Sequence, residues 1–124
     1  MLVELSIENL GIIENVRVSF DKGFTAFTGE TGAGKTMLVE AINLVVGRRA
    51  DASIIRDGAE EARVEARFIT NTASGEVETI LCRVLHREGR SRAYINDRMA
   101  TVASLAEIGD ELVDIHGQHA HQRL

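Results

Sequence analysis

The chain has 124 residues, of which 44% are apolar, and a formal net charge of −5. It holds no run near the roughly 18 apolar residues that a membrane-spanning helix needs, and its one cysteine, Cys82, excludes an internal disulfide. The acidic balance argues against a general nucleic-acid-binding protein. We therefore expect a cytoplasmic chain that forms one domain or part of one.

Three strands are predicted in the first 28 residues. Polar and apolar residues alternate over residues 2–8 and again over residues 12–20, which is typical of half-buried strands. A third, shorter β-prone segment covers residues 24–28 and is bounded by Gly23 and Gly29. Its composition predicts a buried strand that ends where the next motif begins.

That motif is a phosphate-binding loop, which fits the pattern G-x-x-x-x-G-K-[ST] at every fixed position. Its residues are Gly29, Glu30, Thr31, Gly32, Ala33, Gly34, Lys35 and Thr36. The glycines tolerate the backbone conformations that let several N–H groups converge on one triphosphate. Lys35 is expected to reach the β- and γ-phosphates and Thr36 to bind Mg²⁺. The motif predicts a site for ATP and Mg²⁺.

A helix is predicted after the loop, beginning at Gly34, with its positive N-terminal end facing the phosphates. Its apolar face carries residues at i, i+3, i+4 and i+7, namely Leu38, Ala41, Ile42 and Val45. Further apolar residues on its other sides indicate a helix packed between two layers, and Gly47 is expected to end it. Residues 48–58 are polar and predict a loop or a short helical piece.

The middle of the chain predicts an antiparallel sheet. Residues 63–69 alternate again, and residues 71–75 have the composition of a turn. Residues 79–87 and 91–96 read as two strands joined at Glu88 and Gly89, which is a hairpin signal.

Arginines gather in this hairpin. Five fall within sixteen positions, with only Glu88 and Asp97 to offset them, and they are Arg83, Arg87, Arg90, Arg92 and Arg98. Arginine suits bidentate contacts with phosphates, so the cluster is a candidate DNA-binding patch. An ordinary solvated hairpin surface is an equally good interpretation of the same residues.

The last quarter predicts a short helix and one more strand. Thr101 is a candidate N-cap for a helix that ends near Gly109, and residues 112–115 read as a strand. Three histidines follow, His116, His119 and His121. Their spacing is compatible with Zn²⁺, but no cysteine or carboxylate nearby completes a ligand set, so exposed histidines are favoured.

The order of these parts resembles the N-terminal lobe of an SMC-type ABC ATPase head, and in detail a bacterial DNA-repair family within that group. The segments that carry the resemblance are residues 5–9, 28–36, 89–92, 95–96 and 114–122. The resemblance covers essentially the whole chain. It implies an α/β P-loop NTPase fold in which a mixed core sheet is joined to an antiparallel β-subdomain, with the fold incomplete in this chain.

The resemblance also implies roles for single residues. Gln118 resembles the Q-loop glutamine, which contacts Mg²⁺ or its water and senses the γ-phosphate. Arg56 resembles the arginine of SMC heads that lies near the nucleotide and the head–head interface. With Lys35, Gln118 would serve ATP hydrolysis. Two heads would form a homodimer around two ATP molecules and engage DNA at the nucleoid.

Two parts of such an ATPase are missing from this sequence. One is an apolar strand ending in Asp-Glu, whose acids orient Mg²⁺ and activate water. The other is the serine-glycine signature segment that contacts the partner's γ-phosphate. In the resembling family both lie in a C-terminal lobe beyond a coiled coil. We therefore expect residues 1–124 to be an ATP-binding lobe that is inactive alone and pairs with that C-terminal lobe.

A self-contained P-loop kinase or small NTPase is the alternative interpretation. In that case Asp114, at the end of the predicted strand 112–115, would be the Mg²⁺-binding acid. The order of the motifs disfavours it, because the arginine-bearing segment precedes the candidate acid and reads as a sheet.

Overall fold

The computed structural model describes residues 1–20 and 32–115, with side chains placed for residues 1–20 and 37–112. The elements in chain order are β1 (Leu2–Leu10), β2 (Ile13–Ser19), α1 (Gly32–Val45), the short 3₁₀ helix η1 (Ala52–Ile54), β3 (Glu61–Thr72), β4 (Gly75–His86), β5 (Ser91–Ile95), β6 (Arg98–Ala100) and α2 (Val102–Ile115). The strands predicted within residues 2–20 and 63–96 are confirmed, and the predicted loop after α1 contains η1. The expected strand at residues 24–28 lies outside the described residues.

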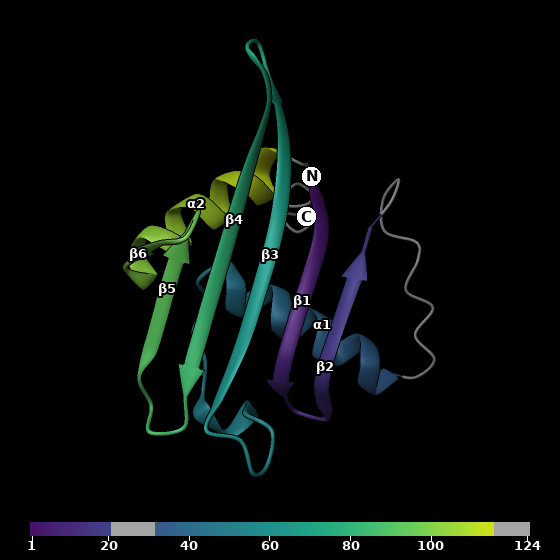
Figure 1. Cartoon of the computed structure of the whole chain (residues 1–124), viewed down its shortest axis with the longest axis vertical. Coiled ribbons are helices and arrows are strands. Elements are labelled where there is room, and N and C mark those ends of the chain that lie inside the picture. The colour runs from purple at the N-terminus through teal and green to yellow at the C-terminus, as the bar shows by residue number, and fades with distance from the viewer. Residues whose placement is uncertain (21–31, 116–124) are drawn as a thin grey trace, which may run out of the picture.

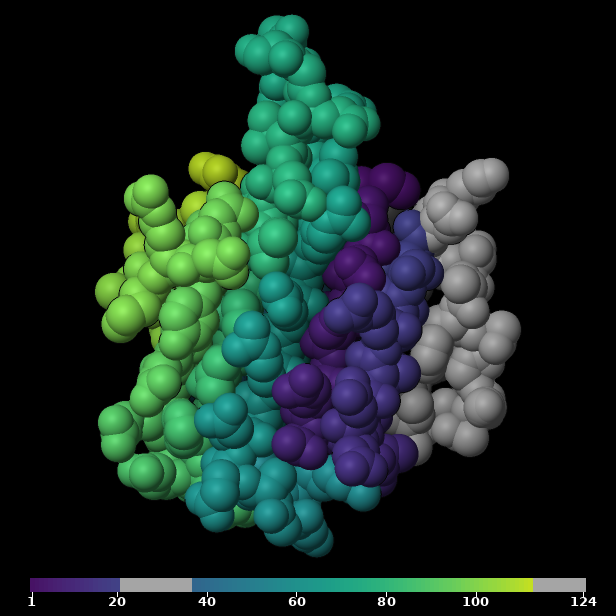
Figure 2. Space-filling view, in the orientation of Figure 1, coloured from purple at the N-terminus to yellow at the C-terminus, as the bar shows by residue number. Residues whose placement is uncertain are grey.

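The described strands form one sheet in the order β2-β1-β3-β4-β5-β6. Every neighbouring pair is antiparallel, which confirms the antiparallel sheet predicted for the middle of the chain. β1 and β2 join the same sheet, so among the described strands the expected mixed core sheet is not separate from it. The β3–β4 pairing runs from Glu61↔His86 to Thr72↔Gly75. This long hairpin projects past the other strands as a finger at the top of Figures 1 and 2.

Both helices lie on one face of the sheet, behind it in Figure 1. α1 packs against β1, β3 and β4, whereas α2 packs against β5. Strand alternation sends every second side chain toward the helices. In β3 these side chains are Ala62, Val64, Ala66 and Phe68, all buried. Burying a side chain such as Val64 or Phe68 stabilises the fold by about 1.5–3 kcal/mol, so the alternation fixes which face the helices cover.

α1 begins at Gly32, two residues earlier than predicted, and the second half of the phosphate motif is therefore its first turn. Its C-terminus is a Schellman motif: the Gly47 N–H donates to Leu44 O at 3.1 Å, and the Arg48 N–H to Asn43 O at 3.0 Å. Gly47 has φ +91°, a conformation that favours glycine. The predicted end at Gly47 is confirmed.

The strand predicted at residues 112–115 is wrong, because α2 continues as one helix to Ile115. The predicted cap is confirmed by the Ser104 N–H, which donates to Thr101 Oγ1 at 2.9 Å.

Gly109 does not end the helix. A Cβ there would lie 2.7 Å from Val46 Cβ, so glycine is what lets α2 approach the end of α1. Leu105, Gly109 and Leu112 are buried with helical spacing. Asp114 thus lies in the last turn of a helix and not at the end of a strand.

The other face of the sheet carries ion pairs between neighbouring strands. Glu4 lies 3.7 Å from Arg17 and 3.9 Å from Arg67, and Arg67 also contacts Glu78. Cys82 on β4 is buried, and burial raises the pKa of its thiol to about 11. This thiol is therefore a core side chain that stays protonated at neutral pH.

No helix among the described residues is long and apolar enough to span a membrane.

Candidate nucleotide site

The described part of the phosphate motif is the start of α1. Gly32, Ala33, Gly34, Lys35 and Thr36 form the first turn of the helix, whereas Gly29, Glu30 and Thr31 lie outside the described residues. The first N–H groups of any helix have no partner within the helix. They also lie at the positive end of its dipole, and the two effects together favour an anion there. The backbone of this segment therefore suits a phosphate group.

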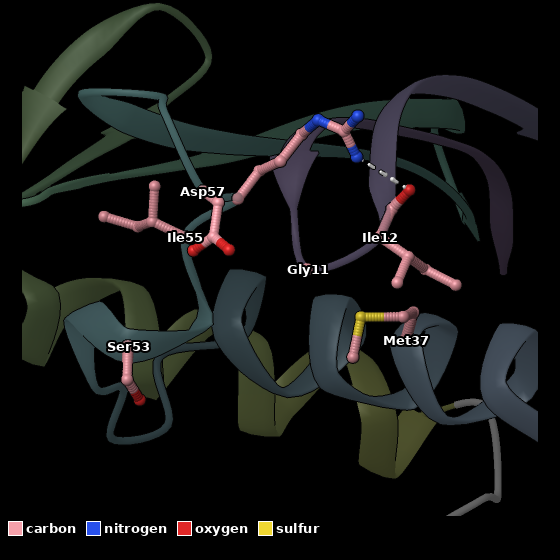
Figure 3. A pocket seen from close by; sticks show the side chains of 7 residues that line it. Gly11, Ile12, Met37, Ser53, Ile55 and Asp57 are labelled. Carbon is pink, nitrogen blue, oxygen red and sulfur yellow. Dashed lines mark hydrogen bonds between the residues drawn. The ribbon is translucent and has the colours of Figure 1, made fainter.

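A cavity of about 670 Å³ lies beside this end of α1. It is lined by Gly11, Ile12, Met37, Ser53, Ile55, Arg56 and Asp57. These residues come from the β1–β2 turn, from α1 and from the segment that begins at η1, three segments that lie next to one another in Figure 3. The size is within the range of about 300–1,000 Å³ found for small-molecule sites.

The cavity adjoins the phosphate motif because Met37 directly follows Thr36 in α1. Ile12, Met37 and Ile55 give it apolar walls, which suit the flat face of a base. At Gly11 the turn approaches Met37 so closely that a Cβ would collide with the thioether. Gly11 also has φ +57°, so any other residue would be strained there.

Arg56, for which the resemblance implies a place near the nucleotide, lines this cavity. Its Nη1 donates to Ile12 O at 3.0 Å, the dashed line in Figure 3, and so joins the η1 segment to the β1–β2 turn. Its backbone N–H donates to Asn9 O at 2.9 Å. A guanidinium has five N–H donors, so others remain for a ligand.

Gln118 and the three histidines 116, 119 and 121 lie outside the described residues. In the part of the chain that the structure describes, no cluster of three or more His, Cys, Asp or Glu side chains is arranged to hold a metal ion. The Mg²⁺-binding roles of Thr36 and Gln118 therefore stay predictions.

Arg83 does not belong to a surface patch, contrary to the prediction for the arginine cluster. Its register with Val64 and Ala93 places it on the helix face, and it is only 4% exposed. Its guanidinium donates to Leu44 O at 2.8 Å, to Arg48 O at 3.1 Å and to the Ser91 hydroxyl at 2.7 Å. Burial lowers the pKa of this arginine. Through these hydrogen bonds Arg83 connects β4 and β5 to the C-terminal end of α1.

The other four arginines of the cluster are exposed, but they differ in their contacts. Arg87 donates to two backbone carbonyls of the Arg56 segment. Arg90 contacts only its neighbour Glu88, at 3.3 Å, among the described residues. Arg92 and Arg98 lie on β5 and β6. By register Arg98 pairs with Ile95, on the opposite face of the sheet from Arg92, so the exposed arginines that remain together are Arg90 and Arg92.

Sequence reasoning missed most of the cavity wall and the role of Arg83. The burial of Arg83 could have been predicted from the sequence. In a strand its side chain points to the same face as those of Leu81 and Leu85, two buried aliphatic residues. An arginine at such a position must find hydrogen-bond acceptors inside the protein. Nothing in the sequence around Gly11, Ile12 or Ile55 indicates that these residues line a cavity.

These features define a lobe with a P-loop nucleotide-binding fold. A family model described as "AAA domain" matches residues 4–118, so the chain belongs to the AAA domain family.

Within that family the chain is similar to the DNA repair protein RecN. The RecN of Halalkalibacterium halodurans is 44% identical over 137 residues, an alignment that covers 100% of this chain and 24% of the relative. The match is to the N-terminal part of RecN, and the chain spans about a quarter of the length of the curated relatives.

The fold is also similar to those of solved SMC head structures. An SMC head domain from Pyrococcus furiosus has a TM-score of 0.74 and 25% identity, covering 91% of this chain and 32% of that one. A structure from work on ATP-driven dimerization and DNA-stimulated activation of SMC ATPases has a TM-score of 0.72 and 26% identity, covering 91% and 77%. The predicted SMC-type fold class is confirmed, and the self-contained kinase is not favoured.

Proposed function

We propose that this chain is the ATP-binding lobe of an SMC-type ATPase head in a RecN-type protein that acts in DNA double-strand-break repair and recombination. The observation that carries the proposal is the position of the cavity. It adjoins the helix whose first turn is the second half of a complete phosphate-binding motif. A polyphosphate site and a base-sized cavity side by side fit a nucleoside triphosphate.

Each part of the nucleotide has a proposed place. The phosphates would bind the backbone N–H groups of residues 29–36, with Lys35 as the cation for the β- and γ-phosphates. The nucleoside would occupy the cavity between Ile12 and Met37, with Arg56 at its edge. Thr36 and Gln118 would hold Mg²⁺, which neutralises phosphate charge.

Hydrolysis also needs a carboxylate to activate water and a partner segment that contacts the γ-phosphate. We assign both to the C-terminal lobe of the intact protein, so that this lobe alone binds ATP without turning it over. Two heads would then trap ATP between them. Because ATP would contact both heads, it would shift the equilibrium toward the paired state.

DNA is the proposed macromolecular partner, which would place the protein in the cytoplasm at the nucleoid. The candidate contact is the pair Arg90 and Arg92, without Arg98, which lies on the opposite face of the sheet from Arg92. Arg90 and Arg92 lie within two residues of each other at the start of β5, and both are exposed. Exposed guanidinium groups gain phosphate contacts without leaving buried acceptors unpaired, unlike Arg83, and Arg90 would give up only its exposed contact with Glu88.

The intact protein is expected to bind duplex DNA more tightly with Mg-ATP than without it, as measured by fluorescence anisotropy. The double variant Arg90→Glu, Arg92→Glu should bind at least tenfold more weakly at low salt. The slope of log affinity against log salt should fall by about 2, because each lost phosphate contact removes about 0.9.

The matched control is Arg17→Glu, which removes an equally exposed arginine from β2, at the opposite edge of the sheet. It should leave the salt slope unchanged. An unchanged slope in the double variant would show that DNA binds elsewhere. Equal DNA affinity with and without Mg-ATP would contradict the proposed link between nucleotide and DNA.

A further inference from the structure

The segment that carries Arg56 is a tight turn held from one side by β1. The Gly11 N–H donates to Ile54 O at 2.8 Å, and the Arg56 N–H donates to Asn9 O at 2.9 Å. After Arg56 the chain turns back on itself, and the Ala59 N–H donates to Arg56 O at 3.0 Å. Gly58 has φ +88° in this turn. The backbone on the β1 side is thus fixed by hydrogen bonds.

From the other side the turn is held by Arg87, the residue that follows β4. Its Nε donates to Ala59 O at 2.8 Å and its Nη2 to Arg56 O at 2.9 Å. Its backbone N–H donates to Glu60 O at 2.8 Å. One residue of the β4–β5 hairpin therefore makes three hydrogen bonds with three of the five residues 56–60.

We propose that Arg87 is a positioning residue that holds Arg56 at the edge of the nucleotide cavity. This inference rests on the proposed function, because it assigns Arg87 to the same site. Arg87 does not line the cavity itself, whereas Arg56 does. Arg87 acts through the carbonyl of Arg56, and the Arg56 side chain then spans to Ile12 O at 3.0 Å.

The geometry calls for arginine at position 87. The two acceptors, Arg56 O and Ala59 O, are the first and last carbonyls of one turn, and a planar guanidinium reaches both with separate N–H groups. A lysine has a single ammonium nitrogen, so it would donate to one of the two carbonyls and leave the other without this partner. Arg87 is exposed, so water replaces part of what is lost when it is removed. We therefore expect replacement of Arg87 to change the Kd for Mg-ATP only moderately.

The test is a double-mutant cycle on the intact protein with Mg-ATP as the probe. Arg87→Ala should raise the Kd for Mg-ATP roughly threefold to tenfold, the range for losing one or two exposed hydrogen bonds. Arg87→Lys should fall between Arg87→Ala and the parent protein. In the Arg56→Ala background, Arg87→Ala should have no further effect on Kd, because Arg87 acts only through Arg56.

Two further readouts separate positioning from general stability. In Arg87→Ala, the apparent KM for ATP should rise while kcat at saturating ATP stays within about twofold of the parent value. The amide of Ala59 should exchange hydrogen faster in the absence of nucleotide. Arg17→Ala is the control, since it removes an exposed arginine from β2 and should leave Kd, KM and Ala59 exchange unchanged.

Additive effects of Arg56→Ala and Arg87→Ala on Kd would overturn the inference, as would an Arg87→Ala protein with the parent Kd. Both results leave the proposed ATP site standing if the parent protein binds Mg-ATP. A parent protein without affinity for Mg-ATP would instead overturn the proposed function and this inference with it.

Discussion

Lys35→Ala is expected to weaken the binding of Mg-ATP to the intact protein about 100-fold, which corresponds to about 2.7 kcal/mol. Removing one partner of a close charge pair at a binding site costs about 2–5 kcal/mol. Lys35 lies in the first turn of α1, where the motif requires a cation for the β- and γ-phosphates. Isothermal titration calorimetry measures the change directly.

The matched control is Lys22→Ala, because Lys22 is the other lysine of this chain and lies outside the phosphate motif. It removes the same charge and should keep parent affinity within about twofold. Both variants should keep the parent melting temperature. A Lys35→Ala protein that is folded and binds Mg-ATP like the parent would refute the role assigned to this residue.

Arg83→Met is expected to lower the free energy of unfolding by about 3 kcal/mol. Each hydrogen bond from a charged donor contributes about 1.5–3 kcal/mol. Arg83 makes three such bonds inside the protein, to two carbonyls at the end of α1 and to Ser91. The gain from no longer burying a guanidinium offsets part of their loss. Urea denaturation measures the difference.

Arg92→Met provides the comparison, since Arg92 is exposed on the neighbouring strand of the same hairpin. Its effect should stay within about 0.5 kcal/mol, the usual range for surface substitutions. Arg83→Lys should lose less than Arg83→Met because it keeps a cation near Leu44 O. A loss below 0.5 kcal/mol for Arg83→Met would mean that the hydrogen bonds of Arg83 to the end of α1 do not stabilise the fold.

Much of the sheet was predictable because strand alternation is a local signal. β3 buries every second side chain from Ala62 to Phe68, and β1 buries Leu5 and Ile7 in the same alternation, which their sequences display directly. Glu88 and Gly89 mark the β4–β5 turn, and the Gly89 φ of +99° explains why glycine stands there. The same rule, applied to Arg83, would have removed it from the surface cluster.

The error in α2 arose from a short apolar run that periodicity cannot assign. Leu112, Val113 and Ile115 fit a buried strand as well as one turn of a helix. Gly109 favoured a break, because glycine commonly follows the end of a helix. Its actual role is tertiary, since Val46 occupies the space that a side chain at position 109 would need. Only the packing of α2 against the end of α1 distinguishes the two cases.

The cavity could not be predicted for a similar reason. Its walls come from residues 11–12, 37 and 53–57, which are separated along the chain and joined by hydrogen bonds such as Arg56–Ile12. No window of the sequence contains them together. The phosphate motif could be predicted, because its chemistry needs eight consecutive residues.

Hydrogen exchange of the amides in residues 29–36 tests most directly whether main-chain N–H groups bind the nucleotide. The measurement compares the intact protein with and without Mg-ATP, using the β3–β4 hairpin tip at residues 72–75 as the internal reference. The N–H groups at the start of a helix lack partners within the helix, so bound phosphate should slow their exchange at least tenfold and leave the hairpin tip unchanged. Saturating Mg-ATP that leaves residues 29–36 exchanging at the rate of the free protein would contradict the account.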